Sequence, residues 1–161
     1  MLTLGRYNLV STAENTTVAR KFVQELFNER KIDKAENFVT SDIVYHGLEE
    51  IKGIENFKQW LGEDLKAFHD MNVTIVDAFG EENKVALKWT LSAMLDSEFL
   101  DMQFSKDDAT KDIEVIQIIR EKFETQGVEI LHFEGGKIKE AWTVFDVMTP
   151  ARKIAQQISA K

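Results

Sequence analysis

Two side chains near the C-terminal end of the sequence have the types and spacing of a proton-transfer site. Asp146 lies four residues after Trp142, in a run of β-branched and aromatic residues that follows the Gly135-Gly136 pair. The glycines can adopt the positive φ angles of a tight hairpin turn, so the run is predicted to be a strand. With a strand period of two, Trp142 and Asp146 share one face of the sheet. We therefore expect Asp146 to be either a pocket carboxylate beside an indole or a solvated charge at a strand end.

An apolar pocket would favour the neutral form of Asp146 and raise its pKa, which suits proton transfer near neutral pH. His46 ends a short extended run, and two roles are open for it: proton-transfer partner of Asp146, or a histidine that simply hydrogen-bonds a backbone carbonyl. Thr143, on the opposite face from Asp146, is interpreted as a strand former. Large side chains are expected either to line a ligand pocket or to form ordinary core: Tyr45, Phe57, Trp60, Trp89 and Trp142.

Helices come before most of the strands that would position these residues. Ser11 and Glu14 match a capping box, and an apolar residue recurs every four positions after it, as in an amphipathic helix: Val18, Phe22 and Leu26. A short second helix is predicted over residues 34–39, and a third one follows Gly53 up to Phe68. From Asn72 onward the pattern becomes that of strands, expected at residues 73–79, 84–95, 113–121, 127–134 and 137–148.

This arrangement predicts a single α+β domain over residues 1–161, with N-terminal helices packed into a strongly curved antiparallel sheet. The polar stretch 101–112 is interpreted as a loop, and residues 150–161 as a short terminal helix. The strands that begin at Lys84 and Lys137 carry apolar residues on both faces. We therefore expect a homodimer that buries the outer face of the sheet.

Composition excludes several classes of function. The 161 residues contain no cysteine, which rules out disulfides, thiolate metal sites and thiol nucleophiles. The three histidines lack a metal-ligand spacing, so we expect neither a metal nor another cofactor. A formal net charge of -8 without a basic cluster argues against nucleic acid as a partner. No stretch approaches the roughly 20 apolar residues of a membrane span, and we expect a soluble, cytoplasmic protein with no membrane partner.

Five short segments also occur in an order that is typical of one protein family: residues 44–46, 53–57, 68–73, 84–90 and 133–146. Over about residues 14–148 the chain resembles the SnoaL-like polyketide cyclases of the nuclear transport factor 2-like superfamily. This resemblance implies a cystatin-like cone, in which a curved sheet wraps around helices and encloses an apolar pocket. It also implies a tendency to dimerise through the outer face of the sheet.

In catalytic members of that family, an Asp on the last strand and a His on an earlier strand move protons in an intramolecular aldol closure. Asp146 matches the Asp, whereas Leu95 stands at the position of the His, and His46 aligns with a pocket His of many relatives. The resemblance implies a cofactor-free cyclase or isomerase that acts on a hydrophobic, polyketide-like carbonyl compound. The alternative is a non-catalytic ligand-binding or dimerisation module, which a pocket filled by Met94, Leu95 and the inserted stretch of about residues 98–122 would favour.

Overall fold

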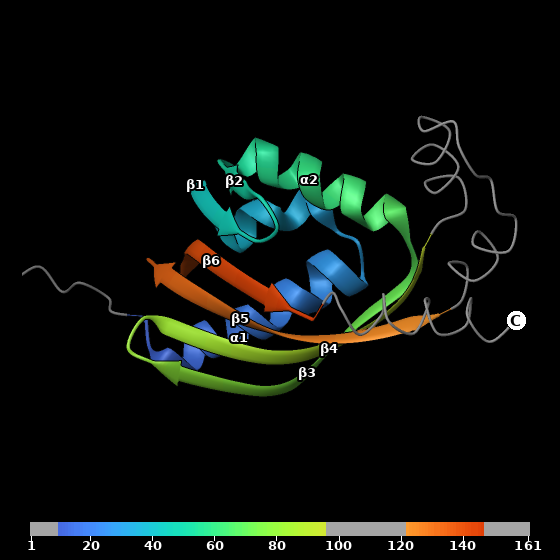
Figure 1. The fold of residues 1–161 in the computed structure, drawn as a ribbon. Coiled ribbons are helices and arrows are strands. Elements are labelled where there is room, and N and C mark those ends of the chain that lie inside the picture. The colour runs from blue at the N-terminus through green and yellow to red at the C-terminus, as the bar shows by residue number, and fades with distance from the viewer. Residues whose placement is uncertain (1–9, 96–121, 147–161) are drawn as a thin grey trace, which may run out of the picture.

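The computed structural model describes residues 10–95 and 122–146. Within these residues a curved sheet bends around the helices (Figure 1). The elements in chain order are α1 (Thr12–Phe22), the π-helical turn η1 (Val23–Asn28), the 3-10 helix η2 (Ile32–Asn37), β1 (Val39–His46), β2 (Glu50–Lys52), α2 (Ile54–Ala67), β3 (Phe68–Glu81), β4 (Lys84–Leu95), β5 (Phe123–Glu134) and β6 (Lys137–Phe145). The strand expected at 113–121, the loop at 101–112 and the helix at 150–161 lie outside the described residues.

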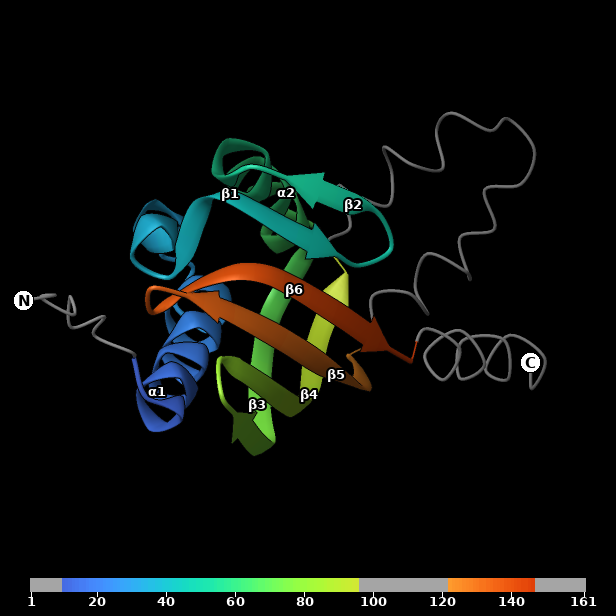
Figure 2. The same cartoon turned by 90° about the vertical axis from the view of Figure 1, so that its left-hand side faces the viewer.

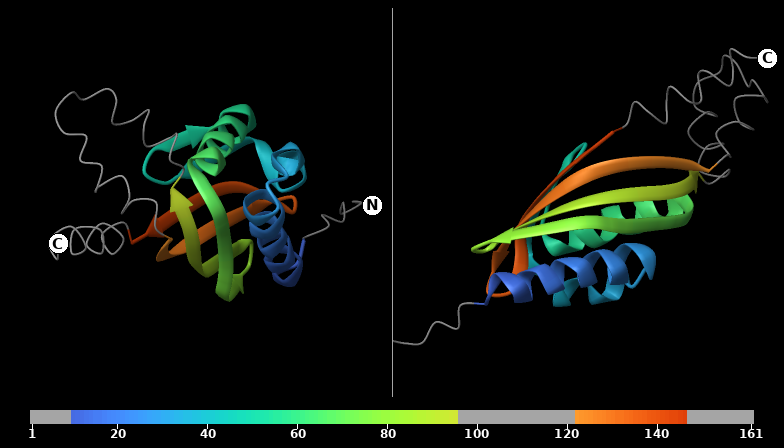
Figure 3. Two further views of the ribbon diagram at one scale, coloured as in Figure 1. Left: turned by 90° about the vertical axis from the view of Figure 1, so that its right-hand side faces the viewer. Right: turned by 90° about the horizontal axis from the view of Figure 1, so that it is seen from below.

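The sheet has six strands in the order β2-β1-β6-β5-β4-β3, as can be followed in Figure 2. Neighbouring strands are antiparallel except β1 and β6, which are parallel. The helices lie on one side of the curved strands, as the right-hand view of Figure 3 shows. The predicted α+β class is confirmed, with the difference that the sheet is mixed rather than wholly antiparallel.

Local signals account for the first and third helices. The Ser11 side chain accepts a hydrogen bond from the Glu14 N–H at 3.2 Å, and the Glu14 carboxylate accepts one from the Ser11 N–H at 2.7 Å, which confirms the capping box. Gly53 precedes α2 with a φ of 81°, an angle that favours glycine. The helix predicted over 34–39 is wrong at its end, because η2 stops at Asn37 and Val39 already pairs in β1.

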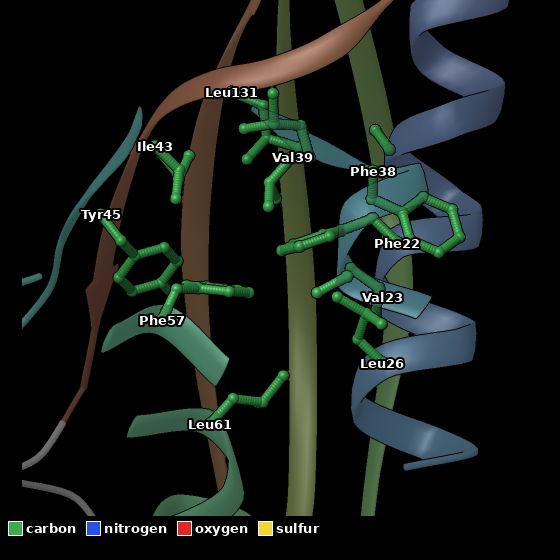
Figure 4. Close-up of a cluster of buried hydrophobic side chains, with 14 of the residues drawn as sticks. Phe22, Val23, Leu26, Phe38, Val39, Ile43, Tyr45, Phe57, Leu61 and Leu131 are labelled. Carbon is green, nitrogen blue, oxygen red and sulfur yellow. The ribbon is translucent and has the colours of Figure 1, made fainter. Parts of the chain in front are cut away.

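A cluster of buried side chains joins the helices to the inner face of the sheet (Figure 4). Phe22 of α1 and Phe57 of α2 are both 0% exposed, and their rings stack with centroids 6.2 Å apart. Ile43 of β1 and Leu131 of β5 close the cluster from the sheet side. Each such side chain stabilises the fold by about 1.5–3 kcal/mol, so this core fixes both helices relative to the strands.

The outer face of the sheet carries large apolar side chains that remain exposed: Val76, Phe79, Val128, Ile130, Trp142 and Val144. On β6 they alternate with inward-facing residues, since Ala141 is fully buried whereas Val144 is 74% exposed. Among the helices that the structure describes, none is long and apolar enough to cross a membrane.

Candidate active site

A cavity of about 410 Å³ lies between the inner face of the sheet and the helical elements η1 and α2. Much of its wall is aromatic, contributed by Phe27, Tyr45, Trp60, Phe68, Trp89, Phe123 and Phe145. Tyr45 and Trp60 are in contact, with ring centroids 4.8 Å apart. The volume and the apolar wall suit a small hydrophobic molecule.

Gly127 on β5 allows the Trp89 side chain to approach the strand closely. A Cβ atom at this position would lie 2.4 Å from Cζ2 of Trp89 and 2.6 Å from the backbone oxygen of Val144. The Trp89 indole therefore lies directly against the β5 backbone, where any side chain would displace it. Trp89 is buried there and contacts Phe145, with ring centroids 6.2 Å apart.

A buried carboxylic acid is the main polar group of the cavity. Glu129, on β5, lines the cavity and is only 4% exposed. Burial raises the pKa of Glu129 to about 7, although the neighbouring Tyr45 hydroxyl acts in the opposite direction. The Oε1 oxygen of Glu129 is buried and has no hydrogen-bond partner within the described part of the chain. A buried acceptor without a partner is costly, so this oxygen is suited to receive a proton or a ligand donor.

Two further polar groups accompany Glu129. Burial raises the pKa of Asp64, on α2, to about 6, and Asp64 also lines the cavity. Burial and the negative charge of Glu129 raise the pKa of the Tyr45 hydroxyl, whereas Thr143 beside it acts to lower it. Carboxyl groups with pKa values near neutrality in an apolar cavity are typical of sites that transfer protons.

The structure divides the residues expected at the site into two groups. Tyr45, Trp60 and Trp89 line the cavity. Phe57 belongs to the neighbouring core, where it is fully buried and contacts Tyr45, and it is not among the lining residues. Trp142 lies on the outer face of the sheet, 37% exposed.

Trp142 meets His46 on that outer face. The two rings stack with centroids 5.2 Å apart and an interplanar angle of 13°. His46 Nε2 lies 2.9 Å from Glu140 Oε1, and Nδ1 lies 3.3 Å from Glu50 Oε2. The imidazole is thus held between two carboxylates and is not part of the cavity lining.

Asp146 follows the last residue of β6 and is half-buried. Its backbone N–H donates to the Gln126 carbonyl at 3.0 Å, and its own carbonyl accepts from the Thr125 hydroxyl. Asp146 is not among the cavity-lining residues, whereas Thr143 and Phe145 of the other face are. The catalytic roles expected for Asp146 and His46 remain predictions.

Sequence reasoning did not single out Glu129 or Asp64. A weak signal exists on β5, where Glu129 is in phase with Leu131 and Phe133, both of which are buried. The residues that alternate with these on β5 include Val128 and Ile130, which are also apolar. The sequence pattern therefore did not identify which face of β5 turns inward. Asp64 follows Trp60 by one helical turn, which places the two on the same side of α2.

Among the described residues, no group of three or more His, Asp or Glu side chains is arranged to hold a metal ion. The carboxyl and hydroxyl groups among the described cavity-lining residues can exchange protons directly with a bound organic molecule.

The sequence profile of the SnoaL-like polyketide cyclases matches residues 17–154. The chain belongs to this family. Its inner-face cavity and curved sheet are consistent with that membership, which confirms the resemblance noted in the sequence. No protein among curated sequences matches the chain.

Solved structures with the same fold include proteins of different described activities. AclR of Streptomyces galilaeus, a proposed hydroxylase, is 22% identical with a TM-score of 0.67, and the match covers 91% of this chain and 98% of the AclR chain. A SnoaL-like polyketide cyclase of Agrobacterium tumefaciens is 16% identical with a TM-score of 0.68, covering 90% and 99%. An epoxide hydrolase of M. tuberculosis is 16% identical with a TM-score of 0.66, covering 92% and 95%. At these identities the likeness shows the fold alone.

Proposed function

We propose that this SnoaL-like protein binds a hydrophobic carbonyl compound in its cavity and acts on it by cofactor-free acid–base catalysis, with Glu129 as the proton-transfer group. The observation that supports this most strongly is the state of the Glu129 carboxyl. It is 4% exposed in an apolar cavity, it has a pKa of about 7, and its Oε1 atom has no partner in the described part of the chain.

The proposed reaction begins with enolisation. At neutral pH the carboxyl of Glu129 is present in both protonation states, so it can accept and return protons. The ionised form takes a proton from the carbon next to the carbonyl group and leaves an enolate. The protonated form then returns that proton to another carbon, which isomerises the compound, or to the oxygen formed when the enolate closes a ring. The Tyr45 hydroxyl interacts with the Glu129 carboxyl and favours its ionised, proton-accepting form.

Proton exchange on a model β-ketoester tests this assignment. Glu129→Gln should lower the rate of exchange by about 100-fold or more, since it removes the only proton-accepting group proposed here. Asp146→Asn and His46→Gln should leave the rate close to that of the wild type, because neither residue lines the cavity. If Asp146→Asn abolishes exchange and Glu129→Gln does not, the sequence-based assignment to Asp146 holds instead.

A non-catalytic ligand carrier is the second candidate. It is favoured by Leu95, which stands where the family's catalytic His is found, and by the position of Asp146 outside the cavity lining. The open cavity is compatible with both functions. Saturable binding of the β-ketoester without any exchange by the wild-type protein would select the carrier.

The exposed apolar residues of the outer sheet face support a further proposal, that two copies pair through this face. Sedimentation should show a species twice the 18.5 kDa of the chain. Ile130 lies on the exposed outer face of β5. Its substitution Ile130→Lys should convert the dimer to a monomer while the fold of each chain is retained. A wild-type monomer at micromolar concentration would contradict this pairing.

A further inference from the structure

In the described part of the chain, the charged residues that line the cavity are all acidic. Glu49 of the turn between β1 and β2, Asp64 of α2 and Glu129 of β5 contribute carboxyl groups. Among the lining residues that the structure describes, none is Lys, Arg or His. An anionic ligand would meet like charges on this described part of the wall, and these charges would disfavour its binding.

Elsewhere in the described chain, carboxylates are commonly paired with lysines. Glu36 lies 2.5 Å from the Lys58 ammonium, and Asp42 forms an ion pair with Lys139. Asp64 differs, because desolvation is the sole cause of its raised pKa and no ion pair with a described residue accompanies it. Glu129 is likewise unpaired at Oε1 and more than nine-tenths buried. The cavity therefore contains two desolvated acids without a cationic partner from the described chain.

Both acids, Asp64 and Glu129, line the same cavity as an aromatic corner, which is formed by the rings of Tyr45 and Trp60. Tyr45 contacts Trp60, with centroids 4.8 Å apart, and Trp60 precedes Asp64 by one turn of α2. Aromatic faces next to carboxylates bind organic cations through cation–π and charge-assisted contacts together.

We propose that the natural ligand of the cavity carries a protonated nitrogen on an apolar skeleton, and that Asp64, assisted by the charge of Glu129 and the faces of Tyr45 and Trp60, binds this nitrogen. The inference rests on the proposed function, because it narrows the substrate class to hydrophobic carbonyl compounds that also bear a basic amine. Asp64 anchors the ammonium group at the aromatic corner, and Glu129 remains available for proton transfer. The net charge of -8 on the chain adds long-range attraction for cations.

Three probes with one skeleton and different charges test this inference: 4-phenylbutylamine, 4-phenylbutanol and 4-phenylbutanoate. Their dissociation constants are measured by calorimetry or by tryptophan fluorescence at about pH 8. We expect the amine to bind about tenfold more tightly than the alcohol, and the carboxylate to bind most weakly, as one charge-assisted contact predicts.

Asp64→Asn should weaken binding of the amine by about tenfold and leave binding of the alcohol unchanged, which also shows that the variant cavity is folded. Glu63→Gln is the matched control, because it removes a carboxylate one residue away that is exposed and bonded to Gln59. It should leave the preference for the amine intact. In the wild type, affinity for the amine should rise as Asp64 and Glu129 lose protons through their pKa values of about 6 and about 7, whereas affinity for the alcohol should not.

An amine that binds no more tightly than the alcohol, or a preference that Asp64→Asn leaves unchanged, would overturn the inference. Its failure is distinguishable from failure of the proposed function. Proton exchange on a neutral β-ketoester without any preference for amines would retain Glu129 catalysis and remove the cationic ligand. Selective amine binding without exchange would retain the cationic ligand and remove the catalysis.

Discussion

Replacing Glu129 by Gln tests the buried state of this carboxyl without reference to any ligand. The rise in its pKa from 4.5 to about 7 corresponds to about 3 kcal/mol of difference between the folded and unfolded environments. Because the folded protein holds this proton more tightly than the unfolded chain, stability falls as the pH rises from 4.5 to about 7. Below that window the group is neutral in both states, and above it the full cost of burying the charge is present.

Glutamine has nearly the same shape as glutamate and carries no charge at any pH. The stability of Glu129→Gln relative to wild type should therefore improve by about 3 kcal/mol between about pH 4.5 and about pH 8. In a chain of this length that change corresponds to a relative gain in Tm of roughly 6–12 °C. Asp64 also has a raised pKa, so its ionisation lowers stability as well, at a lower pH than that of Glu129. This contribution cancels in the difference between the unfolding free energies of the two proteins.

The assay is urea unfolding, followed by circular dichroism at several pH values, for the wild type, Glu129→Gln and Glu124→Gln. Glu124 is an exposed residue of the same strand, so its substitution should change stability by no more than about 0.5 kcal/mol at every pH. A difference between wild type and Glu129→Gln that stays constant with pH would refute the reasoning. It would mean that Glu129 ionises in the folded protein as easily as in the unfolded chain.

Three other substitutions test the surroundings of the site. Tyr45→Phe removes a hydroxyl that lowers the pKa of Glu129, so the midpoint of the pH profile for proton exchange should move to a higher pH, and an unchanged or lower midpoint would contradict the contact. Gly127→Ala should destabilise the protein by about 1–3 kcal/mol and alter tryptophan fluorescence, because the new Cβ displaces Trp89, and a neutral effect on both readouts would count against the close approach. Phe57→Ala should cost about 3–5 kcal/mol in chemical denaturation, since the ring is fully buried in the core, and a loss below 1 kcal/mol would contradict that position.

Much of the fold was predictable because its signals are local. The capping box needs only Ser11 and Glu14, and the apolar stripe after it is set by the helical repeat. The hairpin needs only Gly135 and Gly136, which adopt φ angles of 57° and 81°. Such features depend on contacts within a few residues, so they can be read before the tertiary structure is known.

The faces of the sheet depended on the tertiary structure. A period of two places Trp142 on the opposite face of β6 from Thr143, but it does not say which face turns inward. The inner face carries Thr143 and Phe145, whereas Trp142 stacks on His46 outside. Both phases of the strand are rich in apolar residues, so hydrophobicity alone did not decide the orientation.

The sequence by itself determined the family, the α+β class and the helical and hairpin signals, because these follow from residue order and short-range geometry. Only the tertiary structure decided which acid enters the cavity. The pKa of Glu129 is raised by burial in a cavity whose wall also includes side chains of α2 and β1, which are more than sixty residues away in the sequence. A carboxyl group acquires such a property from its surroundings, and those surroundings exist only once the chain has folded.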